Sequence, residues 1–231
     1  MVKDGRGAAQ PVSRAATVST SPEASAVSRP DAGDSSRANV YKRLSSALAF
    51  PDRALHERAT ADKWPDEIAA EVAALPYRLR MHDLAWPAPD DYDEMQSEYI
   101  RIFQIGGRRG PPCPLHEGHY TRDRSHTLRH LIRFYNYFNF HPAEGVMPDL
   151  LSIELEFMSH LAGGGVSDEQ SLLRAQRDFL KRHLSWLSTL SERVARSGPP
   201  RFYGSLVKLA DRFVAADQQF IKTTLGGIRD A

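Results

Sequence analysis

The sequence has very little cysteine, no long apolar run and almost no net charge. Its single cysteine, Cys113, cannot form a disulfide within the chain, which excludes a disulfide framework and indicates a reducing compartment. No apolar stretch approaches the roughly 18 residues that a membrane-spanning helix needs. The 30 basic and 29 acidic residues nearly cancel, so nothing favours binding to nucleic acid or to an anionic membrane. We therefore expect a soluble cytoplasmic protein that is not inserted in a membrane.

The sequence also lacks a sustained alternation of apolar and polar residues, the pattern typical of strands. From Arg37 onward the apolar residues are instead spaced as in helices, and prolines or glycines separate the helical segments. We expect helices before Pro51, from Pro65, after Asp90-Asp91, from about His119, from Pro148, after Gly163–Gly165 and from Phe202. With 231 residues, 41% hydrophobic, the chain predicts an all-α, single-domain helical bundle over residues 37–231.

Residues 1–36 contain almost no large apolar side chain and are rich in Ala, Ser, Pro, Gly and Arg. Such a segment cannot bury enough surface to offset the entropy of ordering it, so we expect a disordered tail. It has no continuous apolar stretch after its basic start, which argues against a signal peptide.

The stretch CPLHEGHY (113–120) combines the single cysteine with two histidines and a glutamate. Cys113, His116 and His119 have a spacing that a soft divalent metal could use. On one helix from about His119, a stripe of His119, His126 and His130 would face away from the apolar face, where a solvated polar surface explains it equally well. A helical metal- or cofactor-binding protein is thus one interpretation, although Cys-x-x-His lacks the second ligand pair of zinc motifs.

Catalytic groupings do not emerge from the sequence. Pro112 and Pro114 flank Cys113, and no helix start follows directly to lower its pKa, so a small buried or loop cysteine is favoured over a nucleophile. Glu154 and Glu156 are two positions apart on a helix and point in different directions, which predicts no carboxylate pair. We therefore expect a protein that is not an enzyme.

Aromatic residues cluster near the proline-rich loop, and two interpretations remain open for them. Tyr99, Phe103, Tyr135 and Tyr137 could each belong to the core. Together with the prolines they could also line a groove that captures an apolar or helical peptide.

Five segments match, in the same order along the chain, those of a known family: EYIRIFQI (98–105), PPCPLHEGHY (111–120), MPDLLSIELEFMSHL (147–161), FLKRHLSWLSTL (179–190) and FYGSLVKLADRF (202–213). Over most of residues 40–220 the chain resembles the chaperones of the TorD/DmsD/NarJ type, which serve molybdenum-containing oxidoreductases. The form CPLHEGHY is similar to the branch that serves type II enzymes of the dimethyl sulfoxide reductase family, which includes chaperones for dimethyl sulfide, ethylbenzene, selenate and chlorate enzymes.

The resemblance implies an all-helical, non-catalytic protein that binds the molybdenum-containing catalytic subunit, often through its twin-arginine signal peptide. Such chaperones hold the subunit ready for insertion of molybdopterin guanine dinucleotide and delay its export until it is loaded. The resemblance implies no permanently bound cofactor, only transient contact with this dinucleotide through the client, and it does not name the client. It also implies a monomer or a domain-swapped dimer, for which Gly163–Gly165 could act as the hinge.

The partner-binding surface implied by the resemblance lies around the proline-rich loop, whose fixed backbone would lose little entropy on docking. Glu117 and Asp149 would offer negative charge to a basic signal peptide, and Tyr99 and Phe103 an apolar wall. Leu150 stands where many relatives have histidine, so no role of that histidine is carried over. The expected partner-binding residues are Tyr99, Ile102, Phe103, Pro112, Leu115, His116, Glu117 and Asp149.

Overall fold

The computed structural model describes residues 32–106, 110–164, 168–198 and 201–229. Within these ranges the chain forms nine α-helices, a π-helical turn and a 3₁₀ turn, and it has no strand, which confirms the all-α prediction. The elements are α1 (Ala32–Leu48), α2 (Arg53–Thr60), α3 (Lys63–Ala73), α4 (Tyr92–Tyr99), η1 (Ile100–Gln104), η2 (Glu117–His119), α5 (Arg124–Tyr137), α6 (Leu151–Ala162), α7 (Glu169–His183), α8 (Leu187–Arg196) and α9 (Phe202–Arg229).

The first helix begins at Ala32, before the expected start at Arg37. The prediction of disorder for residues 1–36 is wrong for residues 32–36, which belong to α1, and for residues 1–31 it lies outside the described residues, as does Gly165 of the expected hinge. The short helix α2 was not anticipated; the carboxylate of Asp52 caps it by accepting a hydrogen bond from Leu55 N.

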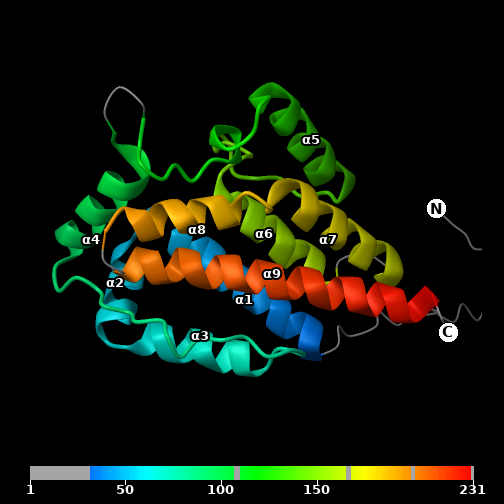
Figure 1. Ribbon diagram of the computed structural model, residues 1–231, viewed down its shortest axis with the longest axis horizontal. Coiled ribbons are helices and arrows are strands. Elements are labelled where there is room, and N and C mark those ends of the chain that lie inside the picture. The colour runs from blue at the N-terminus through cyan, green and yellow to red at the C-terminus, as the bar shows by residue number, and fades with distance from the viewer. Residues whose placement is uncertain (1–31, 107–109, 165–167, 199–200, 230–231) are drawn as a thin grey trace, which may run out of the picture.

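Helix α6 packs against α1 and α7, and α9 runs along the bundle (Figure 1). Helix α1 packs against α3, α6 and α9, while α9 also packs against α7 and α8. Helices α3 and α5 lie on opposite edges of the molecule (Figure 1). None of the helices in the described ranges is both long and apolar enough to cross a membrane.

Helix α6 is buried on nearly all sides, as expected for a helix that is apolar all round. Two of its polar residues, Ser152 and Glu154, are carried into the interior with the rest. A buried carboxyl group needs hydrogen-bond or charge partners, or it must keep its proton. The groups around Glu154 therefore determine its protonation state.

A second buried polar group joins the first and last helices. Arg37 of α1 donates from Nε to Oδ1 of Asp217 in α9 at 2.6 Å and from Nη2 to Oδ2 at 3.0 Å. The hydroxyls of Tyr41 and Tyr77 donate to the same carboxylate at 2.7 and 2.9 Å. Gln176 of α7 accepts from Arg37 Nη2 at 2.5 Å, so this network ties α1, α7 and α9 together.

Candidate functional site

The proline-rich loop is fixed to the segment that precedes α6. Glu117 N donates to the Asp149 carbonyl at 2.9 Å, and Leu151 N donates to the Leu115 carbonyl at 2.8 Å. These bonds close a short antiparallel pairing that the helical pattern of the sequence does not predict. The two segments that the sequence placed near a partner surface are therefore neighbours in space.

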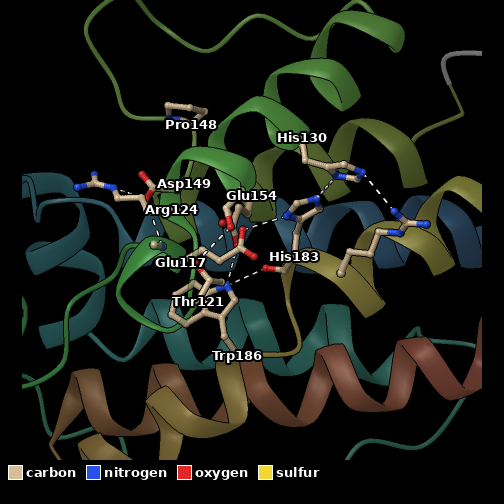
Figure 2. A network of polar contacts seen from close by, with 12 residues as sticks. Glu117, Thr121, Arg124, His130, Pro148, Asp149, Glu154, His183 and Trp186 are labelled. Atoms are coloured by element: carbon tan, nitrogen blue, oxygen red, sulfur yellow. Dashed lines mark hydrogen bonds and ion pairs between the residues drawn. The ribbon is translucent and has the colours of Figure 1, made fainter.

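Asp149 lies at the centre of this contact. It is fully buried, and its carboxylate accepts from Gly118 N at 3.3 Å and contacts His116 Nδ1 at 3.1 Å and Arg124 Nε at 3.5 Å (Figure 2). Burial by itself raises the pKa of Asp149, but the hydrogen bond and charge of His116, the charge of Arg124 and the Gly118 amide together lower it below its ordinary value. The carboxylate thus holds the loop and α5 together.

Only glycine fits at position 118. A Cβ atom there would lie 2.6 Å from Arg124 Cγ and 2.8 Å from the Asp149 carboxylate. The backbone of the loop can approach Asp149 only because this side chain is absent.

The expected role of Asp149 as an exposed acid at a helix start needs correction. Helix α6 begins at Leu151 rather than at Pro148, and its N-terminal cap is Leu150, which makes no side-chain cap. Asp149 is instead turned inward, because the Gly118 amide and two basic side chains satisfy it there.

Glu117 begins a chain of polar contacts that runs toward α5. It is 2% exposed, and its Oε2 is 3.0 Å from Nδ1 of His183 in α7. The other ring nitrogen of His183, Nε2, lies 2.7 Å from Nδ1 of His130. Arg182 Nη1 approaches His130 Nε2 at 3.2 Å and ends the chain near solvent. Figure 2 shows Glu117, His183 and His130 following one another in this order.

Glu154, on α6, faces Glu117 and His183 (Figure 2). Trp186 Nε1 donates to Glu154 Oε2 at 3.2 Å and, more closely, to the His183 carbonyl at 2.7 Å, while Glu154 Oε1 is buried with no hydrogen-bond partner. Burial, followed by the charge of Glu117, raises the pKa of Glu154 well above its ordinary value. We name Glu117, His130, Glu154, His183 and Trp186 the Glu117 network.

Sequence reasoning missed this pair of carboxyl groups. It compared Glu154 with Glu156, which is exposed on the same helix, whereas the neighbour of Glu154 comes from the proline-rich loop. A glutamate within an otherwise apolar helical segment was the available signal.

The predicted histidine stripe also needs correction. His119 belongs to η2, and α5 begins only at Arg124, capped by Asp123, so the three histidines do not share one helix. His126 is exposed, but His130 is half-buried against His183. Part of the stripe therefore turns toward the protein, not toward water.

The metal interpretation gains no support from the geometry. Cys113 is buried, its backbone NH donates to the Ile102 carbonyl at 3.1 Å, and burial raises the pKa of its thiol. His116 is engaged by Asp149. In the described part of the chain, no three or more His, Cys, Asp or Glu side chains are grouped so that they could hold a metal ion.

Most of the expected partner-binding residues are buried. Pro112 is exposed and His116 is half-buried. The other six are at most 5% exposed: Tyr99, Ile102, Phe103, Leu115, Glu117 and Asp149. Tyr99 and Phe103 pack on each other and on Tyr203, with ring centroids 5.0 to 5.7 Å apart. In this conformation these six can shape a binding surface but cannot touch a partner.

An apolar groove lies instead between α5 and α7. Its volume is about 480 Å³, and Tyr137, which contributes to it, is 82% exposed. The groove combines apolar walls with two carboxylates, those of Asp168 and Asp178, and two guanidinium groups, those of Arg133 and Arg174. We name it the α5–α7 groove; its apolar lining is formed by Phe134, Tyr137, Phe138, Leu172 and Ala175.

Comparison with known proteins identifies the family. Residues 61–192 match the model of the nitrate reductase delta subunit family. The chain belongs to that family. A chlorate reductase assembly chaperone protein from Ideonella dechloratans is 34% identical over 168 residues, covering 68% of this chain and 76% of the relative. Four of the five segments that the sequence analysis quoted lie within the matched range, and the fifth (202–213) lies beyond it.

Two further relatives have the same kind of role. A selenate reductase assembly chaperone protein from Thauera selenatis is 34% identical over 128 residues, covering 51% of this chain and 65% of the relative. A perchlorate reductase assembly chaperone protein from Dechloromonas aromatica (strain RCB) is 29% identical over 196 residues, covering 78% and 87%. This member of the nitrate reductase delta subunit family is an assembly chaperone and not an enzyme, as the sequence predicted.

Proposed function

We propose that this chaperone assembles the molybdenum-containing catalytic subunit of a type II enzyme of the dimethyl sulfoxide reductase family. Its client would be an oxyanion reductase related to those that reduce chlorate, selenate or perchlorate. The observation that carries the proposal is the likeness to three chaperones of such reductases. In this role the protein binds the client in the cytoplasm, holds it ready for insertion of molybdopterin guanine dinucleotide, and delays its export until it is loaded.

The α5–α7 groove supports a direct contact with the client's twin-arginine signal peptide. A signal peptide combines basic residues with an apolar stretch, so its receptor needs both apolar walls and acid groups. The groove offers Phe134, Tyr137 and Leu172 as walls. Its charged lining is mixed, since Asp168 and Asp178 are accompanied by Arg133 and Arg174, so the apolar walls support the proposal more than the charges do. An aromatic side chain as exposed as Tyr137 is a favourable anchor, because tyrosine is enriched among residues that dominate binding.

The buried residues of the proline-rich loop are connected to the α5–α7 groove through intervening side chains. His130 lines the groove and also contacts His183 of the Glu117 network. The proline-rich loop therefore reaches the groove through Glu117, His183 and His130, and not by direct exposure.

The proposal is tested by calorimetric titration of the chaperone with the precursor of a candidate catalytic subunit, with and without its leader. We expect the leader to strengthen binding, and we expect Tyr137→Ala to weaken it about tenfold. The matched control is Ile105→Ala, which removes a 66% exposed apolar side chain near η1.

Two outcomes would contradict separate parts of the proposal. If no precursor from this enzyme family binds the wild-type chaperone, the assignment of the client is wrong. If the precursor binds but Ile105→Ala weakens it as much as Tyr137→Ala does, the groove is not the contact surface.

A further inference from the structure

A second cavity lies on the other side of the Glu117 network, between the loop after η2 and the corner where α7 meets α8. Its volume is about 350 Å³. Thr121 and Trp186, both shown in Figure 2, line it together with Tyr120. Three arginines from different elements also line it: Arg122 from the loop, Arg182 from α7 and Arg193 from α8. We name this cavity the arginine pocket.

None of the three arginines forms an ion pair with a carboxylate within the described ranges. Other arginines of the described ranges are divided: some are paired, as Arg43 is with Glu67 and Glu71, and others, such as Arg129, are not. What distinguishes this site is that three unpaired arginines line one cavity. Arg182 contacts the imidazole ring of His130, which is not a carboxylate, at 3.2 Å. The arginine pocket thus gathers cationic groups whose charge the protein itself does not balance with a direct carboxylate contact.

Two stacked aromatic rings hold one of these charges, that of Arg193, in place. The Arg193 guanidinium lies 4.6 Å from the centroid of the Tyr120 ring. That ring stacks on Trp186 at 4.7 Å, with an angle of 25° between the planes. Such stacking orders an arginine side chain before a ligand arrives, which reduces the entropy lost on binding.

The electrostatic balance of the pocket is positive. Its one acidic lining residue, Glu117, is 2% exposed and is engaged by His183 at 3.0 Å. Burial lowers the pKa of His119, which is also part of the lining; Arg193 contributes in the same direction, and Asp149 opposes it.

We propose that the arginine pocket binds the phosphate or pyrophosphate group of a small phosphorylated molecule. Guanidinium groups bind phosphate oxygens through paired N–H donors, and they do so better than they bind spherical anions. The hydroxyls of Thr121, Ser185 and Thr189 line the same cavity and add neutral donors. A volume of about 350 Å³ lies at the lower end of the range for small-molecule sites, which suits a phosphate-bearing end group.

The inference does not depend on the identity of the client, so it can be tested on the isolated chaperone. Inorganic pyrophosphate is titrated at low salt and followed by calorimetry and by tryptophan fluorescence. We expect saturable binding with a fluorescence change that disappears in Trp186→Phe, because Trp64 and Trp86 lie together elsewhere, against Phe202.

Two substitutions should weaken the binding. Arg122→Gln and Arg193→Gln each remove a charged donor, and we expect each to raise the Kd about tenfold. Arg196→Gln is the matched control: Arg196 is on the same helix as Arg193, its side chain is 72% exposed, and it pairs with Glu192 outside the pocket. It should change the Kd by less than about twofold.

The proposal is overturned if pyrophosphate shows no saturable binding to the wild-type protein. It is also overturned if Arg196→Gln weakens binding as much as the pocket variants do, since the interaction would then reflect diffuse charge. If Arg193→Gln disturbs folding through its contact with Tyr120, Arg122→Gln on the loop still decides the question. Circular dichroism of each variant separates these cases.

Discussion

Two buried polar networks in this bundle differ in how completely their charges are balanced. In the network of Arg37 and Asp217, one guanidinium meets one carboxylate, and two tyrosine hydroxyls donate to the same carboxylate. In the Glu117 network, two carboxyl groups lie near each other with histidines and one indole NH. Both are buried, yet only the first pairs each charge with an opposite one.

The network of Arg37 and Asp217 has a structural role, whereas the stability of the fold does not explain the Glu117 network. Burial lowers the pKa of Arg37, but Asp217 more than offsets this, so the guanidinium stays charged where it joins α1 to α9. For Glu154 the environment favours the neutral form instead: its pKa is raised, and its Oε1 has no hydrogen-bond partner. Perturbed ionisable groups of the second kind concentrate at functional sites. The Glu117 network lies between the proposed client groove and the arginine pocket, consistent with that rule.

The largest effect is expected from breaking the balanced network. Asp217→Asn keeps the size of the side chain but removes the carboxylate charge that the buried Arg37 contacts at 2.6 and 3.0 Å. We expect a loss of about 3–5 kcal/mol in the free energy of unfolding, measured by urea denaturation at pH 7. The control is Asp83→Asn, which removes a surface carboxylate that also binds an arginine, Arg212. A loss for Asp217→Asn no greater than for the control would show that the buried pair does not hold the bundle together.

A smaller loss is expected from Asp149→Asn. The amide cannot replace the charge that His116 and Arg124 contact, so we expect a loss of about 1.5–3 kcal/mol at pH 7. Because the folded pKa of Asp149 is lowered, its contribution is present above the unfolded pKa and disappears as pH falls through the folded value. The difference between variant and wild type should therefore shrink in acid.

Asp123→Asn is the matched control for that experiment. Asp123 is exposed and caps α5 by accepting from His126 N, and asparagine caps a helix as well as aspartate does. A near-native stability of both variants would show that Asp149 is not needed to fix the loop to α5.

The helices could be predicted from the sequence, but the networks could not. Caps and proline stops act over a few residues, which is why the stop before Pro51 and the Asp91 cap of α4 were correct. The contact between Glu117 and His183 joins residues 66 positions apart and depends on how a loop docks on two helices. A helical wheel that starts at His119 cannot show that α5 begins at Arg124, so it misplaces His130. The candidate site therefore required the tertiary structure.

The smallest effect, with the opposite sign, is expected from completing the unbalanced network. Glu154→Gln has the same shape without an ionisable proton; its oxygen can still accept from Trp186, and its amide can donate to Glu117. In wild type the folded state retains the proton of Glu154 above pH about 4.3, where the unfolded chain releases it. Stability therefore falls as pH rises from that value toward the folded pKa, and the variant escapes this loss.

We expect Glu154→Gln to be more stable than wild type at pH 7, because glutamine has no proton that the unfolded chain would release and the folded state would retain. The two proteins should converge near pH 4. Glu156→Gln, on the exposed side of the same helix, should leave the pH dependence of unfolding unchanged. If Glu154→Gln shows the same pH dependence as wild type, Glu154 is ionised in the folded protein, and the Glu117 network is as well balanced as the network of Arg37 and Asp217.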